Sequence, residues 1–141
     1  MRRQLEPERA ASVVLRSEPG YFDHLEQVLS SCADPTANRN DHGAEHFDFH
    51  NRLLRLDDSP TVDGRTVTML IQASSRYLRL AVCAAGSPLD YHRVWGNPHL
   101  DLLDAFRSGD PQVARTAMVD YLLQAERFAR TATVNHGAPV E

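Results

Sequence analysis

Apolar residues recur at helical spacing along most of the chain, and short polar stretches rich in Gly and Pro separate these segments. Two segments carry long apolar faces. One comprises Val67, Leu70, Ile71, Ser74, Leu78, Ala81 and Val82, and the other comprises Val113, Ala114, Ala117, Met118, Tyr121, Leu122, Ala125 and Phe128. No segment of any length alternates apolar and polar residues as a half-buried strand does. The pattern therefore predicts an all-α protein.

The breaks between segments indicate about six helices. The first is expected from about Pro7 to Arg16, the second over the stretch SEPGYFDHLEQVLSSC, and the third from Asn40 or Asp41 to about Leu56. The fourth is expected from about Val62 to Ala85, the fifth begins near Pro98, and the sixth runs from Pro111 to about Ala132. In the sequence SGDP, Gly109 ends one helix, Asp110 caps the next and Pro111 takes its first position. We expect an antiparallel bundle over residues 1–132, followed by a flexible tail over 133–141.

Size and composition suit one globular domain. The chain has 141 residues, of which 42% are hydrophobic, enough to bury a single core. No apolar run is long enough to span a bilayer, no signal peptide is recognisable, and the two cysteines do not make a disulfide framework. We therefore expect a cytoplasmic protein without membrane contact.

The charge distribution bears on nucleic-acid binding. The formal net charge is -4, and the basic residues, all of them arginine, are scattered along the chain. Binding to phosphate backbones requires a concentrated basic surface. We therefore expect no direct DNA contact by this chain alone.

Seven histidines are the main candidates for chemistry. His46 and His50 are four residues apart in the third expected helix, on a face that also carries apolar residues, and His99 begins an apolar stripe in the fifth. A bundle could bring these three histidines and Tyr121 to one level, where a divalent metal would satisfy the imidazoles. The alternative is that the histidines are hydrogen-bonded core residues without a metal.

Three stretches resemble the FadR C-terminal domain, the effector-binding domain of the FadR subfamily of GntR transcription regulators. They are RRQLEPERAASVVLRSEPGYFDHLEQVL, HFDFHNRLL and PHLDLLDAFRSGDPQVARTAMVDYL. Arg2, Leu5, Glu6, Ala10 and Ala11 match the opening of that domain. The resemblance implies a helical bundle with a central cavity for a small metabolite, often a carboxylate.

The resemblance also implies a divalent metal held by one aspartate and three histidines. His50 matches the histidine of the Phe-His stretch, and His99 matches the histidine of the Glu-His helix. Two positions differ, because His46 stands in place of the aspartate and Tyr121 in place of the last histidine. Asp48 points away from the face of His50. We therefore predict a zinc, nickel or manganese site formed by His46, His50 and His99.

The leading functional hypothesis is a sensor of a small organic acid, working as a homodimer, as the resemblance implies. Tyr121, Ser74, Arg76 and Arg79 are the expected ligand-binding residues, since hydroxyl and guanidinium groups bind carboxylates. Members of the family carry a winged-helix domain before the bundle, and no such segment is recognisable here, so DNA contact requires a domain outside these residues.

Two alternatives remain. A three-histidine metal can activate water for hydrolysis, but the sequence offers no convincing general base, so we expect no enzyme. The other alternative is a dimerisation or interaction module that binds neither metal nor metabolite.

Overall fold

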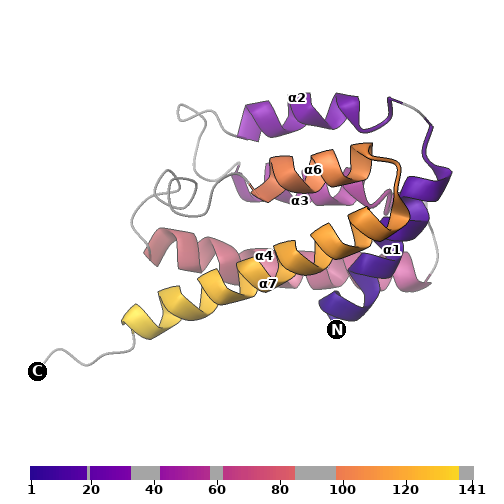
Figure 1. Cartoon of the computed structure of the whole chain (residues 1–141). Helices are drawn as coiled ribbons and strands as arrows, with labels where there is room; N and C mark the ends of the chain where they lie inside the picture. The colour runs from indigo at the N-terminus through magenta and orange to yellow at the C-terminus, as the bar shows by residue number, and fades with distance from the viewer. Residues whose placement is uncertain (19, 33–41, 58–61, 85–97, 137–141) are drawn as a thin grey trace, which may run out of the picture.

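The computed structural model describes residues 1–18, 20–32, 42–57, 62–84 and 98–136 of the chain; the side chains at 30–32, 42–45, 76–84 and 132–136 are not part of the description. The described residues form six helices and no strand, as Figure 1 shows. The helices are α1 (Arg2–Arg16), α2 (Asp23–Cys32), α3 (His42–Leu53), α4 (Val62–Ala84), α6 (Pro98–Arg107) and α7 (Pro111–His136). The prediction of an all-α bundle is confirmed.

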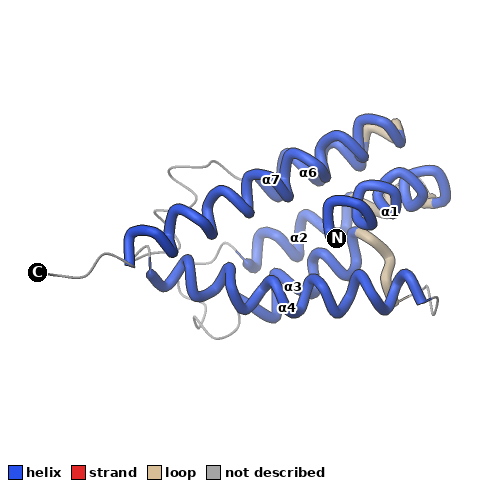
Figure 2. Tube along the Cα trace, turned by 90° about the horizontal axis from the view of Figure 1, so that it is seen from below, coloured by secondary structure: helices blue, strands red, loops and turns tan. Residues whose placement is uncertain are grey.

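The longest helix, α7, organises the bundle by contacting α1, α4 and α6. In Figure 1 it crosses obliquely in front of α4, with its first half beside α1. On the other side of the bundle α2 packs on α3 and α6, and α3 packs on α4. Figure 2 shows the same arrangement from below, with α4 on the side opposite α6 and α7. In Figure 1, helices α3 and α6, which carry the candidate histidines, lie between α2 on one side and α4 and α7 on the other.

The core is formed by apolar faces that the sequence predicts. Its largest fully buried side chains are Phe49, Phe106, Leu53, Leu54, Ile71, Leu102, Leu103 and Met118. On α4, Val67 and Ile71 are buried, and the side chains of the predicted residues Leu78, Ala81 and Val82 lie outside the description. Phe22 of the α1–α2 connection meets Phe106 of α6 edge to face, with ring centroids 5.4 Å apart. Val113 is an exception to the expected inward stripe of α7. It lies in the first turn of that helix, before the residues of α7 that pack into the core, and it is 44% exposed.

The turn between α6 and α7 follows the residues of the SGDP sequence. Gly109 adopts a positive φ of 72°, which glycine accommodates without a steric penalty. The Asp110 carboxylate accepts hydrogen bonds from the backbone N–H groups of Gln112 and Val113, at 2.7 and 3.3 Å. These bonds cap α7 as expected, and the short turn makes α6 and α7 neighbours in space.

Three helix boundaries differ from the expected ones. Helix α1 begins at Arg2, so that Pro7 lies inside it and not at its start; the extra turn is held by the ion pair between Arg2 and Glu6. Helix α3 ends at Leu53 instead of Leu56, and α7 continues past Ala132 to His136. Helix limits are the feature that sequence patterns place least precisely. Asn40 and Asp41, the expected caps of α3, lie outside the described residues.

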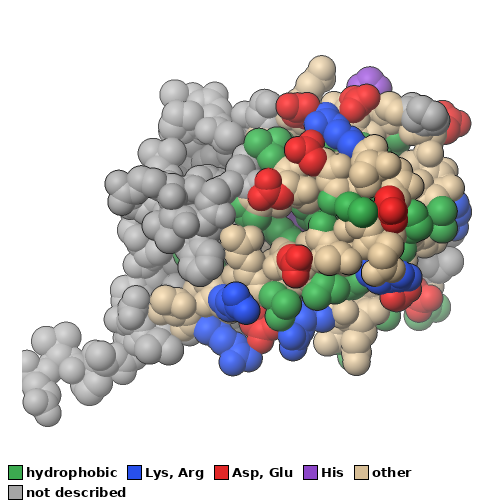
Figure 3. Space-filling model, in the orientation of Figure 1, with side chains coloured by type: hydrophobic (Ala, Val, Ile, Leu, Met, Phe, Trp, Pro, Cys, Tyr) green, Lys and Arg blue, Asp and Glu red, His purple; other side chains and the backbone are tan. Residues whose placement is uncertain are grey.

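Ion pairs connect the helices at the surface. Arg107 of α6 contacts Asp23 and Glu26 of α2, and Arg115 of α7 contacts Glu8 of α1. On the face drawn in Figure 3, acidic and arginine side chains are interspersed and form no continuous basic surface. Among the described helices there is none whose length and apolar character would allow it to cross a bilayer.

Candidate metal centre

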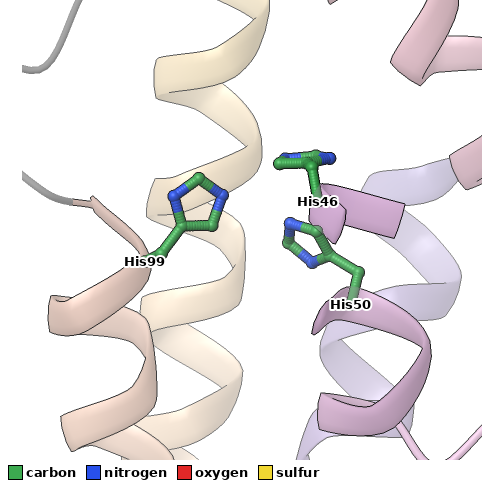
Figure 4. A group of neighbouring side chains, drawn as sticks. All are labelled: His46, His50 and His99. Atoms are coloured by element: carbon green, nitrogen blue, oxygen red, sulfur yellow. The ribbon is translucent and has the colours of Figure 1, made fainter. Parts of the chain in front are cut away.

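Helices α3 and α6 bring three imidazoles together. His46 and His50 are one turn apart on α3, and His99 lies in the first turn of α6, facing them (Figure 4). The ring centroids are 4.6 Å apart for His46 and His50, 5.0 Å for His46 and His99, and 5.5 Å for His50 and His99. His50 is fully buried, His99 is 9% exposed and His46 is partly buried. The cluster predicted from sequence spacing is therefore present.

Tyr121 of α7 completes the cluster. Its hydroxyl oxygen lies 3.1 Å from Nε2 of His46, 2.8 Å from Nε2 of His50 and 3.1 Å from Nε2 of His99. A hydroxyl donates one hydrogen and accepts up to two, so three neutral imidazoles satisfy it when one Nε2 accepts and the other two donate. All three side chains thus point at one oxygen atom contributed by a different helix.

Burial keeps the two histidines of α3 uncharged. It lowers the pKa of His46 to about 4, with a smaller contribution from the positive charge of Arg2. The pKa of His50 is lowered well below its usual value, first by burial and then by the neighbouring His46, His99 and Arg2. Both imidazoles are neutral at pH 7, which is the form that binds metal ions.

The donor set suits a divalent transition metal. The three histidines can each offer one nitrogen, and these nitrogens all lie within 4.8 Å of one another. Nitrogens bound to a tetrahedral zinc ion are about 3.4 Å apart, so the most distant pair would have to approach by up to about 1.4 Å. Nδ1 of the buried His50 has no hydrogen-bond partner among the described residues. This nitrogen lies across the imidazole ring from Nε2, the atom that faces Tyr121, so it would not itself bind a metal held at the centre of the cluster.

Ser74 lies in a polar network beside this cluster. Its hydroxyl donates to the carbonyl oxygen of Leu70 at 2.7 Å and accepts from Nη1 of Arg2 at 2.7 Å. The Arg2 guanidinium also pairs with the carboxylate of Glu6, which is only 1% exposed. Burial raises the pKa of Glu6, while the hydrogen bond and charge of Arg2 lower it.

Arg2 was missed as a site residue by sequence reasoning, although it belongs to the stretch that carries the family resemblance. Its influence on the pKa values of His46 and His50 indicates that its charge is close to the cluster. The Arg2–Glu6 spacing of four residues was the available signal, because it predicts an ion pair on one helical face. The side chains of Arg76 and Arg79, the guanidinium groups predicted instead, lie outside the described part of α4.

Asp48 takes no part in the cluster. It points outward and pairs with Arg52 at 2.8 Å, as its position two residues from His50 predicts. The Asp48 carboxylate is therefore not available to a metal in this arrangement.

Comparison with known proteins gives one result. The family model described as FCD domain matches residues 1–124, which include every helix described above except the end of α7. Neither a curated protein nor a solved structure gives a match to the chain.

Proposed function

The chain belongs to the FCD domain family, the C-terminal effector-binding domains of GntR-family regulators, and on this premise we propose that it senses a small organic acid with the help of a divalent metal ion. His46, His50 and His99 would hold the metal. FCD domains are parts of transcription regulators and not of enzymes, so the proposed activity is binding.

The observation that carries this proposal is the convergence of three imidazoles from two helices in the interior of the bundle. Burial of this kind is costly for imidazoles unless they are satisfied by partners. At least two of them are neutral at pH 7, which leaves their nitrogens available to a metal ion.

Arg2 and Ser74 supply the complementary binding group. When bound, the metal would offer positive charge and an open coordination position to a carboxylate oxygen. The Arg2 guanidinium is planar and has five N–H donors, of which three make the bonds to Glu6 and Ser74 described above. Its charge would attract the same carboxylate. Arg76 and Arg79 remain candidates for further contacts from α4.

Sensing would proceed through the helices that contribute to the site. His46 and His50 lie on α3, His99 on α6 and Tyr121 on α7, so a ligand that draws these side chains together favours one arrangement of the bundle. In a homodimer, such a shift would change how the two bundles pack and reorient attached DNA-binding domains. The homodimer and its location in the cytoplasm are parts of this proposal.

One observation favours a second candidate function. The Tyr121 hydroxyl already provides a hydrogen-bond partner for all three imidazoles. A cluster satisfied in this way is stable without metal, and the domain would then serve as a dimerisation or interaction module that binds neither metal nor metabolite.

Metal content distinguishes these functions. The chain is purified without a histidine tag, and its bound metal is measured by elemental mass spectrometry beside His50→Ala, His99→Ala and His24→Ala, the last of which removes an exposed histidine as a matched control. We expect near-stoichiometric metal in the wild type and in His24→Ala, and its loss in the other two. Equal content in all four proteins would rule out the proposed site.

Effector binding requires a separate measurement. The metal-loaded protein is titrated calorimetrically with a panel of small carboxylates, with and without a chelator. We expect binding of at least one carboxylate, abolished by the chelator. Absence of both metal and carboxylate binding from a folded protein would favour the interaction module.

A further inference from the structure

The oxygen of Tyr121 occupies the point on which the three histidines converge. It lies 2.8–3.1 Å from Nε2 of each imidazole. A metal ion bound by these three nitrogens would have to lie between them, at a distance of about 2.1 Å from each. The ion would then be in contact with the tyrosine oxygen unless that side chain moved away.

The surroundings of Tyr121 oppose such a movement. The side chain is 5% exposed and belongs to the main apolar core. Its ring packs against His50 and His99, with centroids 5.0 and 5.2 Å apart. It projects from the middle of α7, the helix that contacts α1, α4 and α6. A side chain packed at this density cannot rotate away without opening a cavity or displacing its neighbours.

We infer that the phenolic oxygen of Tyr121 is the fourth ligand of the metal ion, in a site with His46, His50 and His99. This inference rests on the proposed function, since it requires that a metal binds. On binding, the divalent ion replaces the phenolic hydrogen, which leaves to solvent as a proton. The unit of one divalent ion, one phenolate and three neutral imidazoles carries a single net positive charge.

The composition of this ligand set bears on which metal and effector it accepts. Three imidazoles suit zinc, copper, nickel and iron, and a phenolate adds a hard oxygen donor. Four protein ligands complete a tetrahedral site, so a carboxylate effector would bind as a fifth ligand or through the remaining positive charge and Arg2. A preference for a carboxylate is retained in both cases.

The test uses zinc alone as the probe and the ultraviolet difference spectrum of ionised tyrosine as the signal. The untagged chain is stripped with a chelator and titrated with zinc at pH 7. We expect the signal of one tyrosinate per bound zinc ion. It should be absent from Tyr121→Phe and unchanged in Tyr21→Phe, the matched control, whose hydroxyl donates to the carbonyl oxygen of Arg52 at 2.8 Å on the exposed surface.

Zinc affinity gives an independent result. Removing a group that merely orients a metal ligand weakens metal binding by about tenfold or more. Tyr121→Phe removes a ligand itself, so its zinc affinity should fall by at least tenfold. Tyr121→His supplies an imidazole at the same position and should bind zinc tightly without the tyrosinate signal. Circular dichroism establishes that each variant is folded. The tyrosinate signal of the wild type tests the inference even if a variant does not fold.

Two outcomes would overturn this inference and leave the proposed sensor intact: zinc binding to the wild type without a tyrosinate signal, or equal or tighter binding by Tyr121→Phe. The second outcome would mean that the hydroxyl competes with the metal. Failure of the folded wild type to bind zinc, nickel or manganese would instead overturn both this inference and the proposed metal site.

Discussion

The hydroxyl oxygen of Tyr121 lies 2.8 Å from Nε2 of His50, although the two residues are separated by 71 positions in the chain. Both side chains are buried, one on α7 and the other on α3. The contact therefore links two helices through polar atoms in the interior of the bundle. In the metal-free protein it satisfies an imidazole nitrogen, and with a metal present it places an oxygen beside that nitrogen.

This contact predicts the effect of Tyr121→Phe on the metal-free protein. The substitution retains the ring but leaves three imidazole nitrogens without their common partner. Leaving a buried polar group unsatisfied costs about 1–3 kcal/mol, and we expect a loss of free energy of unfolding in that range. Tyr21→Phe removes a hydroxyl at the exposed surface and should cost less than about 1 kcal/mol. Urea denaturation in the presence of a chelator measures both; equal losses would contradict the structural role of the buried hydroxyl.

The low pKa of His46 predicts a dependence of stability on pH. Its pKa is about 4 in the folded protein, against an ordinary value of 6.5 that applies when the chain is unfolded. The unfolded chain therefore binds the proton first as the pH falls, so the stability provided by the neutral imidazole is complete above pH 6.5 and is lost as the pH falls through about 4. One pKa unit corresponds to about 1.4 kcal/mol, so about 2 kcal/mol should be lost between pH 8 and pH 4.5.

His46→Gln is the control for this pH dependence, because the amide is polar but does not titrate. Both proteins are unfolded in urea with a chelator present. Between pH 8 and pH 4.5, the free energy of unfolding of the variant should decline by about 2 kcal/mol less than that of the wild type. His50 also has a pKa lowered mainly by burial, which the substitution leaves in place, so it contributes a loss in both proteins. Parallel declines in the two proteins would show that His46 is not the titrating group.

Part of the site could be predicted from the sequence because the geometry involved is local. The four-residue spacing of His46 and His50 fixes their common face in any helix, and the stripe after His99 orients α6. The convergence of Arg2 on Ser74 depends instead on how α1 packs against α4, between residues 72 positions apart. No local pattern contains that information. The start of α1 was missed although its signal is local, since Arg2 and Glu6 are four residues apart and pair on one helical face.

The backbone conformation of Arg55, just after the end of α3, is another feature that the sequence does not indicate. Arg55 has a φ of 47°, a conformation that glycine adopts more readily than other residues. Its N–H donates to the carbonyl oxygen of Arg52 at 3.0 Å, and the N–H of Leu56 donates to that of Asn51 at 2.9 Å. These bonds form the helix-ending motif in which glycine is usual. The Arg55 guanidinium lies 4.9 Å from the ring centroid of Tyr21, a contact that favours arginine at this position.

Two substitutions separate the backbone effect from the side-chain effect at Arg55. Arg55→Ala and Arg55→Gly both remove the guanidinium, but only glycine relieves the left-handed conformation, which costs other residues about 1–2 kcal/mol. We expect Arg55→Gly to be more stable than Arg55→Ala by about 1 kcal/mol, and close to the wild type because the lost contact with Tyr21 offsets the gain. Thermal or urea unfolding measures the difference. An alanine variant as stable as the glycine variant would contradict the positive φ.

The ion pair between Arg2 and Glu6 predicts how the first turn of α1 depends on its charges. Glu6 is almost completely buried, and Arg2 opposes the rise in its pKa that burial causes. Arg2→Gln removes this partner, so the carboxylate is left buried without a positive charge. Breaking a buried pair costs about 3–5 kcal/mol, and because Arg2 is 21% exposed we expect about 2 kcal/mol at pH 8. Urea denaturation measures this loss, and Glu6→Gln in the same chain should restore more than half of it by removing the unpaired charge.

The same variants show whether the charge or the shape of Arg2 is responsible. Without Arg2, burial still raises the pKa of Glu6. The folded protein then binds a proton at higher pH than the unfolded chain, so its stability increases as the pH falls. The loss caused by Arg2→Gln should therefore be smaller at pH 5 than at pH 8, whereas the double variant Arg2→Gln, Glu6→Gln should show no such recovery. A loss independent of pH would indicate that packing of the Arg2 stem, and not its pairing with Glu6, stabilises the start of α1. Carboxylate binding should be weakened in Arg2→Gln and in the double variant alike, because both lack the guanidinium that would bind the effector.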